Sequence, residues 1–104
     1  MLDIDDLRGL CGDKNIAITK HARSRLVERG IVIGDVKNAI QTGDVIKQYV
    51  DDKPFPSCLL LGETGQGQYI HVVASTDNGI LYIITAYYPD ENEWESDLKN
   101  RKEQ

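Results

Sequence analysis

QYIHVVASTDNGILYIITAYY, residues 68–88, is the stretch that decides the fold. It contains two apolar runs rich in β-branched and aromatic residues, which favour extended strands. Between them, TDNG carries the Asn-Gly dipeptide that is typical of a two-residue hairpin turn. The stretch therefore predicts two neighbouring antiparallel strands.

Side-chain alternation along these strands predicts which residues share a face. On the first strand, Tyr69, His71 and Val73 share one side. On the second strand, the residues predicted to share one side are Leu81, Ile83, Thr85 and Tyr87. Whether the two sets lie on the same face of the sheet depends on the pairing register, which alternation alone does not determine.

Two further extended runs precede the hairpin. DVIKQYV at 44–50 ends in the turn-rich DDKPFP, and SCLLLGE follows at 57–63. GETGQG at 62–67 lacks the GK[ST] ending of a phosphate-binding loop and opens no helix, so we interpret it as a turn between strands. The expected sheet has three to four antiparallel strands.

Within the first 43 residues, the spacing of apolar residues and the capping residues predict three helices. The predicted helices cover about 3–11, 20–29 and 34–42, with 15–19 as a short extended link. Thr19 is a suitable N-cap for the second helix, and Gly30 is suited to the left-handed conformation that often ends a helix. The acidic residues 91–103 predict a final helix, with Trp94 and Leu98 as an i,i+4 apolar pair that packs against the body of the protein.

Helices followed by a strand meander indicate an α+β fold, with helices packed on one face of the antiparallel sheet. A length of 104 residues fits a single domain over 1–104. The apolar stretches are too short to cross a bilayer, and the acidic N-terminus lacks the basic region of a secretory signal, so we expect a cytoplasmic protein. Cys11 and Cys58 are far apart and form no CxxC motif, which favours two reduced, buried thiols.

Positive charge is concentrated in residues 19–31, TKHARSRLVERGI, although the chain has a formal net charge of −5. His21, Arg25 and Arg29 are spaced four residues apart and form one slowly turning helical stripe. Such a stripe suits a phosphate or a carboxylate, because guanidinium groups give bidentate contacts to either. The alternative is a solvated face, paired with the acidic tail. Lys20 and Arg23 are further candidate substrate-binding cations.

The chain has two histidines, His21 in the stripe and His71 in an apolar strand. Two histidines can share the acid and base roles when a 2′-hydroxyl cleaves its neighbouring phosphodiester, a reaction that needs no metal or cofactor. Arg25 and Arg29 would then stabilise the developing charge on phosphorus. The alternative for His71 is a hydrogen-bonded structural role. The acidic loop pairs lack His or Cys partners, so we expect no metal site.

Tyr87 and Tyr88 point to opposite faces of the last strand, so only one of them can share a cleft with Thr85. An outward-facing tyrosine can stack on a base or donate a hydrogen bond to a phosphate. The alternative is that either tyrosine packs in the core.

The run KHARSRLVERGI, followed by VKNAIQTGDVI, CLLLG, YIHVV and IITAYYPDENEWESD, resembles a bacterial family of domains of unknown function, DUF4258. The resemblance covers about residues 16–98. That family is thought to be similar to the barnase, EndoU, colicin and RelE fold group, in which many members are metal-independent endoribonucleases acting as toxins. The resemblance implies a RelE/barnase-like fold, and its pattern matches His21, Arg25, Arg29, His71, Thr85 and Tyr87.

Two hypotheses of function follow. The first is a metal-independent endoribonuclease, the toxin of a pair with a cognate antitoxin, in which one histidine is the general base, the other is the acid, and Tyr87 assists. The second is a non-catalytic binding module that uses the arginine stripe to hold an RNA backbone or an acidic protein partner. Catalysis requires His21 and His71 to lie close together, whereas binding requires only exposed arginines.

Overall fold

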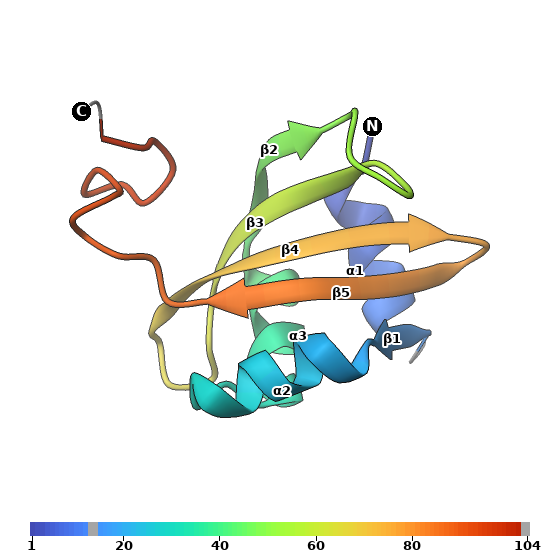
Figure 1. Cartoon of the computed structure of the whole chain (residues 1–104), viewed down its shortest axis with the longest axis horizontal. Helices are drawn as coiled ribbons and strands as arrows, with labels where there is room; N and C mark the ends of the chain where they lie inside the picture. The colour runs from blue at the N-terminus through green and yellow to red at the C-terminus, as the bar shows by residue number, and fades with distance from the viewer. Residues whose placement is uncertain (13–14, 103–104) are drawn as a thin grey trace.

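The computed structural model describes residues 1–12 and 15–102, and these residues form three α-helices and one five-stranded sheet (Figure 1). The elements in chain order are α1 (Ile4–Gly12), β1 (Ile16–Ile18), α2 (Lys20–Glu28), α3 (Ile33–Thr42), β2 (Asp44–Tyr49), β3 (Ser57–Glu63), β4 (Tyr69–Asp77) and β5 (Ile80–Tyr87). The strand order across the sheet is β1-β5-β4-β3-β2. Among the described residues, no helix is both long and apolar enough to cross a membrane.

The hairpin predicted from residues 68–88 is confirmed as β4 and β5, at the centre of the sheet. Asp77 pairs with Ile80, which leaves Asn78 and Gly79 as a two-residue turn with φ of 50° and 76°. Positive φ at both central positions is the requirement of a type I′ turn, and Asn-Gly meets it at low steric cost.

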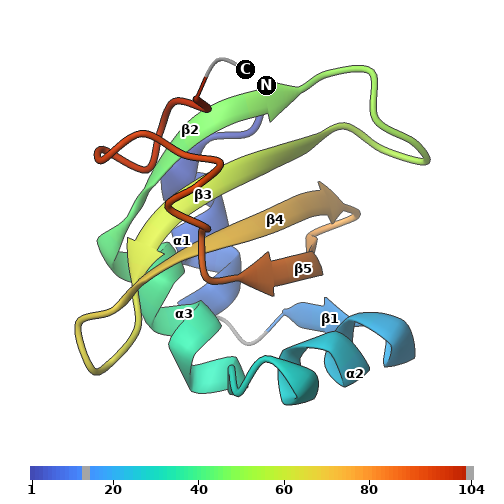
Figure 2. The ribbon, with the colours of Figure 1, turned by 60° about the vertical axis from the view of Figure 1, so that its left-hand side comes forward.

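The α+β fold class is confirmed, with the helices contributing to a core on one face of the sheet (Figures 1 and 2). Fully buried side chains from α1, α3 and the sheet form this core, including Leu7, Val36, Ile40, Leu60 and Val72. α2 runs beside β5 and β1 and adds Leu26. Both cysteines are free and buried, as predicted.

Two of the helix boundaries follow from capping chemistry. The Thr19 hydroxyl accepts a hydrogen bond from the Ala22 backbone N–H at 3.1 Å, which confirms the predicted N-cap of α2. After α2, Gly30 has φ of 69°. The chain can therefore turn directly into α3 without the steric cost that a side chain would impose.

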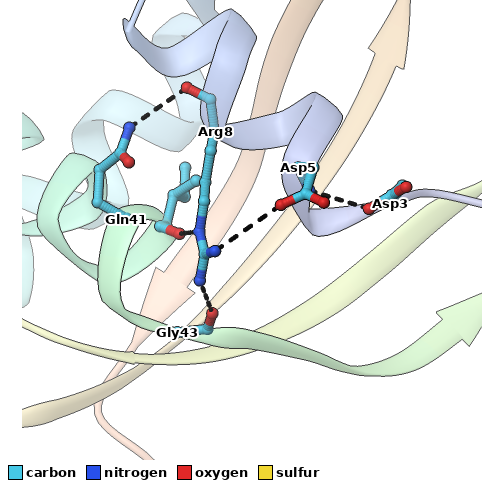
Figure 3. Close-up of polar contacts among 6 residues, drawn as sticks. Asp3, Asp5, Arg8, Gln41 and Gly43 are labelled. Atoms are coloured by element: carbon cyan, nitrogen blue, oxygen red, sulfur yellow. Dashed lines mark hydrogen bonds and ion pairs between the residues drawn. The ribbon is translucent and has the colours of Figure 1, made fainter.

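Arg8 ties α1 to the end of α3 (Figure 3). Its Nε donates to the Ile40 carbonyl at 3.3 Å and its Nη2 donates to the Gly43 carbonyl at 2.8 Å. In return, the Gln41 amide donates to the Arg8 carbonyl at 3.2 Å. The last carbonyls of a helix lack partners within the helix, so this guanidinium satisfies groups that would otherwise need water.

α3 approaches β3 closely at a glycine. A Cβ built on Gly62 would lie 2.7 Å from the Cα and the carbonyl carbon of Ala39, and closer still to its carbonyl oxygen. Real side chains do not tolerate such contacts, so this helix can sit on this strand only because residue 62 has no side chain.

The expected number of three to four antiparallel strands is wrong, because residues Ile16–Ile18 add a fifth strand. β1 pairs with β5 in parallel, with Ile16 opposite Leu81 and Ile18 opposite Ile83. A three-residue run carries too little alternation to indicate a strand, and the pairing depends on the neighbouring edge of β5.

The predicted shared side for Leu81, Ile83, Thr85 and Tyr87 is also wrong. The β4–β5 register shifts between Val73 and Ala74, so that Val73 pairs with Thr85 and Ala74 pairs with Ile83. The extra residue, Ile84, is a bulge that reverses the alternation. Leu81 and Ile83 therefore face the core, whereas Thr85 and Tyr87 face the opposite side of the sheet, together with His71.

The helix predicted over 91–103 is wrong for the described residues, and residue 103 lies outside them. Residues 88–102, here called the tail, form turns and one isolated bridge between Trp94 and Arg101. The carboxylates of Asp90 and Asp97 accept backbone N–H bonds from residues two or three positions later. These local bonds compete with the helical ladder.

Candidate functional site

His71 lies at the centre of the sheet face that carries no helix, and both of its ring nitrogens have partners. Its Nε2 lies 2.7 Å from the Leu98 carbonyl oxygen, and its Nδ1 lies 3.3 Å from the Tyr87 hydroxyl. A carbonyl oxygen can only accept, so Nε2 carries the proton and Nδ1 accepts from the hydroxyl. The imidazole therefore has no free nitrogen for a substrate.

The tail covers His71. The Trp94 ring stands edge-on to the imidazole, with centroids 4.4 Å apart, and the Tyr87 ring does so at 5.3 Å. The His71 side chain is fully buried and Trp94 is 6% exposed. Burial lowers the pKa of His71 below its ordinary value of 6.5, while the bond to the Leu98 carbonyl acts in the opposite direction. The ring is therefore neutral at pH 7.

Arg29 and Thr85 form a second polar contact beside this histidine. The Arg29 Nη1 donates to the Thr85 hydroxyl at 3.0 Å and to the Ala86 carbonyl at 2.9 Å. Arg29 is the C-cap of α2, so these bonds fasten the end of the helix to β5. A role in holding the fold therefore accounts for this arginine.

Tyr87 contacts His71 and stands two residues after Thr85 on β5, the strand to which Arg29 is bonded. Burial raises the pKa of its hydroxyl, Tyr49 and Glu93 act in the same direction, and Arg101 and Arg29 oppose them. Four of the predicted site residues thus come together on one face: His71, Thr85, Tyr87 and Arg29, from β4, β5 and the end of α2.

The other predicted residues lie on the exposed side of α2. Lys20, His21, Arg23 and Arg25, here called the α2 basic surface, are all exposed. His21 and Arg29 are eight residues apart, a rise of about 12 Å along the helix. His21 is exposed in the first turn of α2, whereas His71 is fully buried on β4 beneath the tail, so the two histidines lie in different surroundings.

The acidic tail does not neutralise the α2 basic surface. Within residues 1–12 and 15–102, Arg25 pairs at 3.6 Å with Glu28 of its own helix, and the tail acid Glu93 pairs at 3.6 Å with Arg101 of the tail. Both partners of the Arg25–Glu28 pair are about half exposed or more, and such pairs contribute little. The cations of α2 therefore remain available to an external anion.

The sequence interpretation missed the part that the tail has in the site. Trp94 was predicted to pack against the body of the protein, which is correct, but its contact is His71 rather than a helical neighbour. The Leu98 contact uses a backbone carbonyl, which every residue type has, so the sequence could not indicate it. Within the described residues, no three His, Cys, Asp or Glu side chains gather in a way that could hold a metal ion.

Comparison with known proteins identifies residues 18–88 as a match to the family model described as Domain of unknown function (DUF4258). The match covers more than half of the chain, from the last residue of β1 to the residue after β5. No curated protein and no solved structure matches the chain.

Proposed function

We propose that this chain, which belongs to the DUF4258 family of domains of unknown function, is a non-catalytic binding module that holds an RNA backbone on the α2 basic surface. The observation that carries the proposal is four exposed basic side chains on the first six residues of α2, in a chain of net charge −5. Clustered cations of this kind attract polyanions through local fields, even when the net charge has the opposite sign.

The position of these cations within the helix adds support. The N-terminus of a helix carries partial positive charge, so the Lys20 ammonium in the first turn, beside the basic His21, is unfavourable by about 0.3–1 kcal/mol. α2 has no acidic residue in that turn to compensate for them. A bound anion would relieve this repulsion, and local conflicts of this kind are expected at functional sites.

A nucleic-acid backbone suits this surface better than a folded acidic protein. The side chains are flexible and cationic, and the surface contains no aromatic ring that would form a central anchor in a protein interface. Lysine and arginine contacts to phosphates supply sequence-independent affinity. We therefore expect binding with little base preference.

We propose that the chain is not catalytic because its two histidines differ in burial and in hydrogen bonding. The imidazole of His71 is buried with both nitrogens engaged, and His21 is exposed on α2. General acid–base catalysis needs a group within hydrogen-bonding reach of the reacting atoms. A neutral, fully bonded His71 is accounted for by its structural role.

The test is the fluorescence anisotropy of a labelled single-stranded RNA dodecamer, titrated with wild-type protein and with the Lys20→Gln, Arg25→Gln double variant. We expect at least a tenfold loss of affinity in the double variant at low salt, and an unchanged affinity in the matched variant Lys53→Gln, which removes an exposed charge from the loop between β2 and β3. Equal affinity of all three proteins for the RNA would contradict the proposal. Absence of RNA binding by all three would contradict it as well. Binding of an acidic peptide in place of RNA would assign the surface to a protein partner.

A second candidate is the metal-independent endoribonuclease, with a RelE/barnase-like fold, a cognate antitoxin and a cytoplasmic site of action. The gathering of Arg29, Thr85, Tyr87 and His71 on one sheet face favours it. Displacement of Leu98 and Trp94 would be needed before His71 could reach a substrate. RNA cleavage in excess EDTA by wild type, abolished in both His71→Gln and Tyr87→Phe, would establish this function, and intact RNA with every protein would exclude it.

A further inference from the structure

A basic hollow lies between the edge strand β2 and the tail. It encloses about 480 Å³ and is lined by Lys47 and Tyr49 from β2 and by Trp94, Lys99 and Arg101 from the tail. Three cations and two aromatic rings thus meet at one place, from segments about 50 residues apart in the chain. None of these five residues belongs to the α2 basic surface.

Two of the cations are held in place by the rings. The Lys47 Nζ lies 5.4 Å from the centroid of Tyr49, and the Arg101 guanidinium carbon lies 5.4 Å from the centroid of Trp94. Glu93 offsets the charge of Arg101, at 3.6 Å. Among the described residues, Lys47 and Lys99 have no ion-pair partner, so the hollow keeps an excess of positive charge. A phosphate group, which carries more charge and more acceptor oxygens than a carboxylate, suits several such donors at once.

A second hollow adjoins the first, and Tyr49 lines both. It is a shallow hollow of about 650 Å³ that is widely open to solvent, and the other residues that line it include Val50, Val73, Asp51 and Asp52. The Asp52 carboxylate already accepts from the Ser57 hydroxyl at 2.6 Å, whereas Asp51 is exposed. Carboxylates repel a phosphate, while the apolar wall and the Tyr49 ring suit a planar base. The two hollows therefore differ in the chemistry that they accept.

We propose that the paired hollows bind a nucleoside monophosphate, with its phosphate against Lys47, Lys99 and Arg101 and its base across Tyr49 in the second hollow. The opposite charges of the two hollows give the ligand one orientation. An amino group on the base would face the free Asp51 carboxylate, so adenosine monophosphate suits the site better than uridine monophosphate. The site is separate from the α2 basic surface and does not depend on the RNA-binding proposal.

The test is isothermal titration of the full chain with adenosine monophosphate, adenosine and inorganic phosphate, together with the fluorescence of Trp94, which is the only tryptophan of the chain. We expect the monophosphate to bind at least tenfold more tightly than either part alone and to change the Trp94 emission. Lys47→Gln should weaken binding about fivefold to tenfold, because it removes one charge-assisted contact. Lys37→Gln, which removes a charge elsewhere, should leave the affinity unchanged.

Three results would overturn the inference. Equal affinity for adenosine and its monophosphate would show that the phosphate contributes nothing to binding. Equal affinity for inorganic phosphate and the monophosphate would show that the base contributes nothing. Unchanged affinity in Lys47→Gln would place binding elsewhere. RNA binding by the α2 variants is measured with different side chains, so failure here leaves that result unaffected.

Discussion

Replacement of Gly62 by alanine tests how closely α3 packs on β3. The new methyl carbon would lie 2.7 Å from two backbone carbons of Ala39, whereas nonbonded carbons prefer about 3.5–4.0 Å. The helix would have to retreat by about 1 Å, and it carries Val36, Ala39 and Ile40, all fully buried. Overpacking of this kind typically costs 1–3 kcal/mol, and rigid backbone on both sides puts this case near the upper end, at about 3 kcal/mol.

Urea and thermal denaturation followed by circular dichroism measure this cost. A loss of about 3 kcal/mol corresponds to a Tm lower by roughly 12 °C or more for a chain of this size. Gly65→Ala is the matched control, because no atom lies within 4 Å of a Cβ there, and it should change the free energy of unfolding by no more than about 0.5 kcal/mol. A Gly62→Ala protein as stable as wild type would refute the close contact of α3 with β3.

Three further predictions concern single contacts. Thr19→Ala removes the N-cap of α2 and should cost about 1 kcal/mol in urea denaturation, with Thr19→Ser restoring most of it. Arg29→Gln loses the bonds to Thr85 and the neighbouring carbonyl, and we expect a loss of about 1–2 kcal/mol; a stability equal to wild type would show that these bonds contribute nothing. Because the pKa of His71 is lowered on folding, the unfolded chain binds more protons, so stability should fall as pH drops below about 6.5. Between pH 7.5 and 5.5 this slope should persist in His21→Gln and flatten in His71→Gln, and a slope unchanged in His71→Gln would contradict the assignment.

Elements with strong local signals were predictable from the sequence. The Asn78–Gly79 turn and the Thr19 cap depend on backbone conformation and hydrogen bonds within a few residues, so the residue types alone indicate them. The central hairpin and the α+β class followed from these signals and from the apolar periodicity.

Features that depend on distant contacts were not predictable. The three-residue strand β1 forms only because the edge of β5 is available to pair with it. The bulge at Ile84 reverses the alternation, so that Thr85 and Tyr87 face the side of His71 while Leu81 and Ile83 face the core, whereas strict alternation would put all four on one side. The tail was predicted to be a helix from its composition, but side-chain to backbone bonds at Asp97 and the packing of Trp94 on the sheet prevail.

Only part of the residue group around His71 was predictable from the sequence, and the contacts of its members were not. His71, Tyr87, Thr85 and Arg29 do meet on one face, although the pairing register that brings them together could not be derived from the residues. His21 stands in the first turn of α2, about 12 Å of helical rise before Arg29, which is the member of the stripe that contacts β5. Nothing in the strand pattern indicated that a backbone carbonyl of the tail, that of Leu98, would accept a hydrogen bond from the His71 ring.

The salt dependence of RNA binding tests the central claim most directly. For single strands, the slope of log K against log salt concentration is about −0.7 for each neutralised phosphate. If Lys20 and Arg25 each contact one, the slope measured between 50 and 200 mM salt by anisotropy should be less steep by about 1.4 in the double variant than in wild type. Equal slopes in the two proteins, or no RNA binding by wild type at low salt, would contradict the claim that α2 holds an RNA backbone.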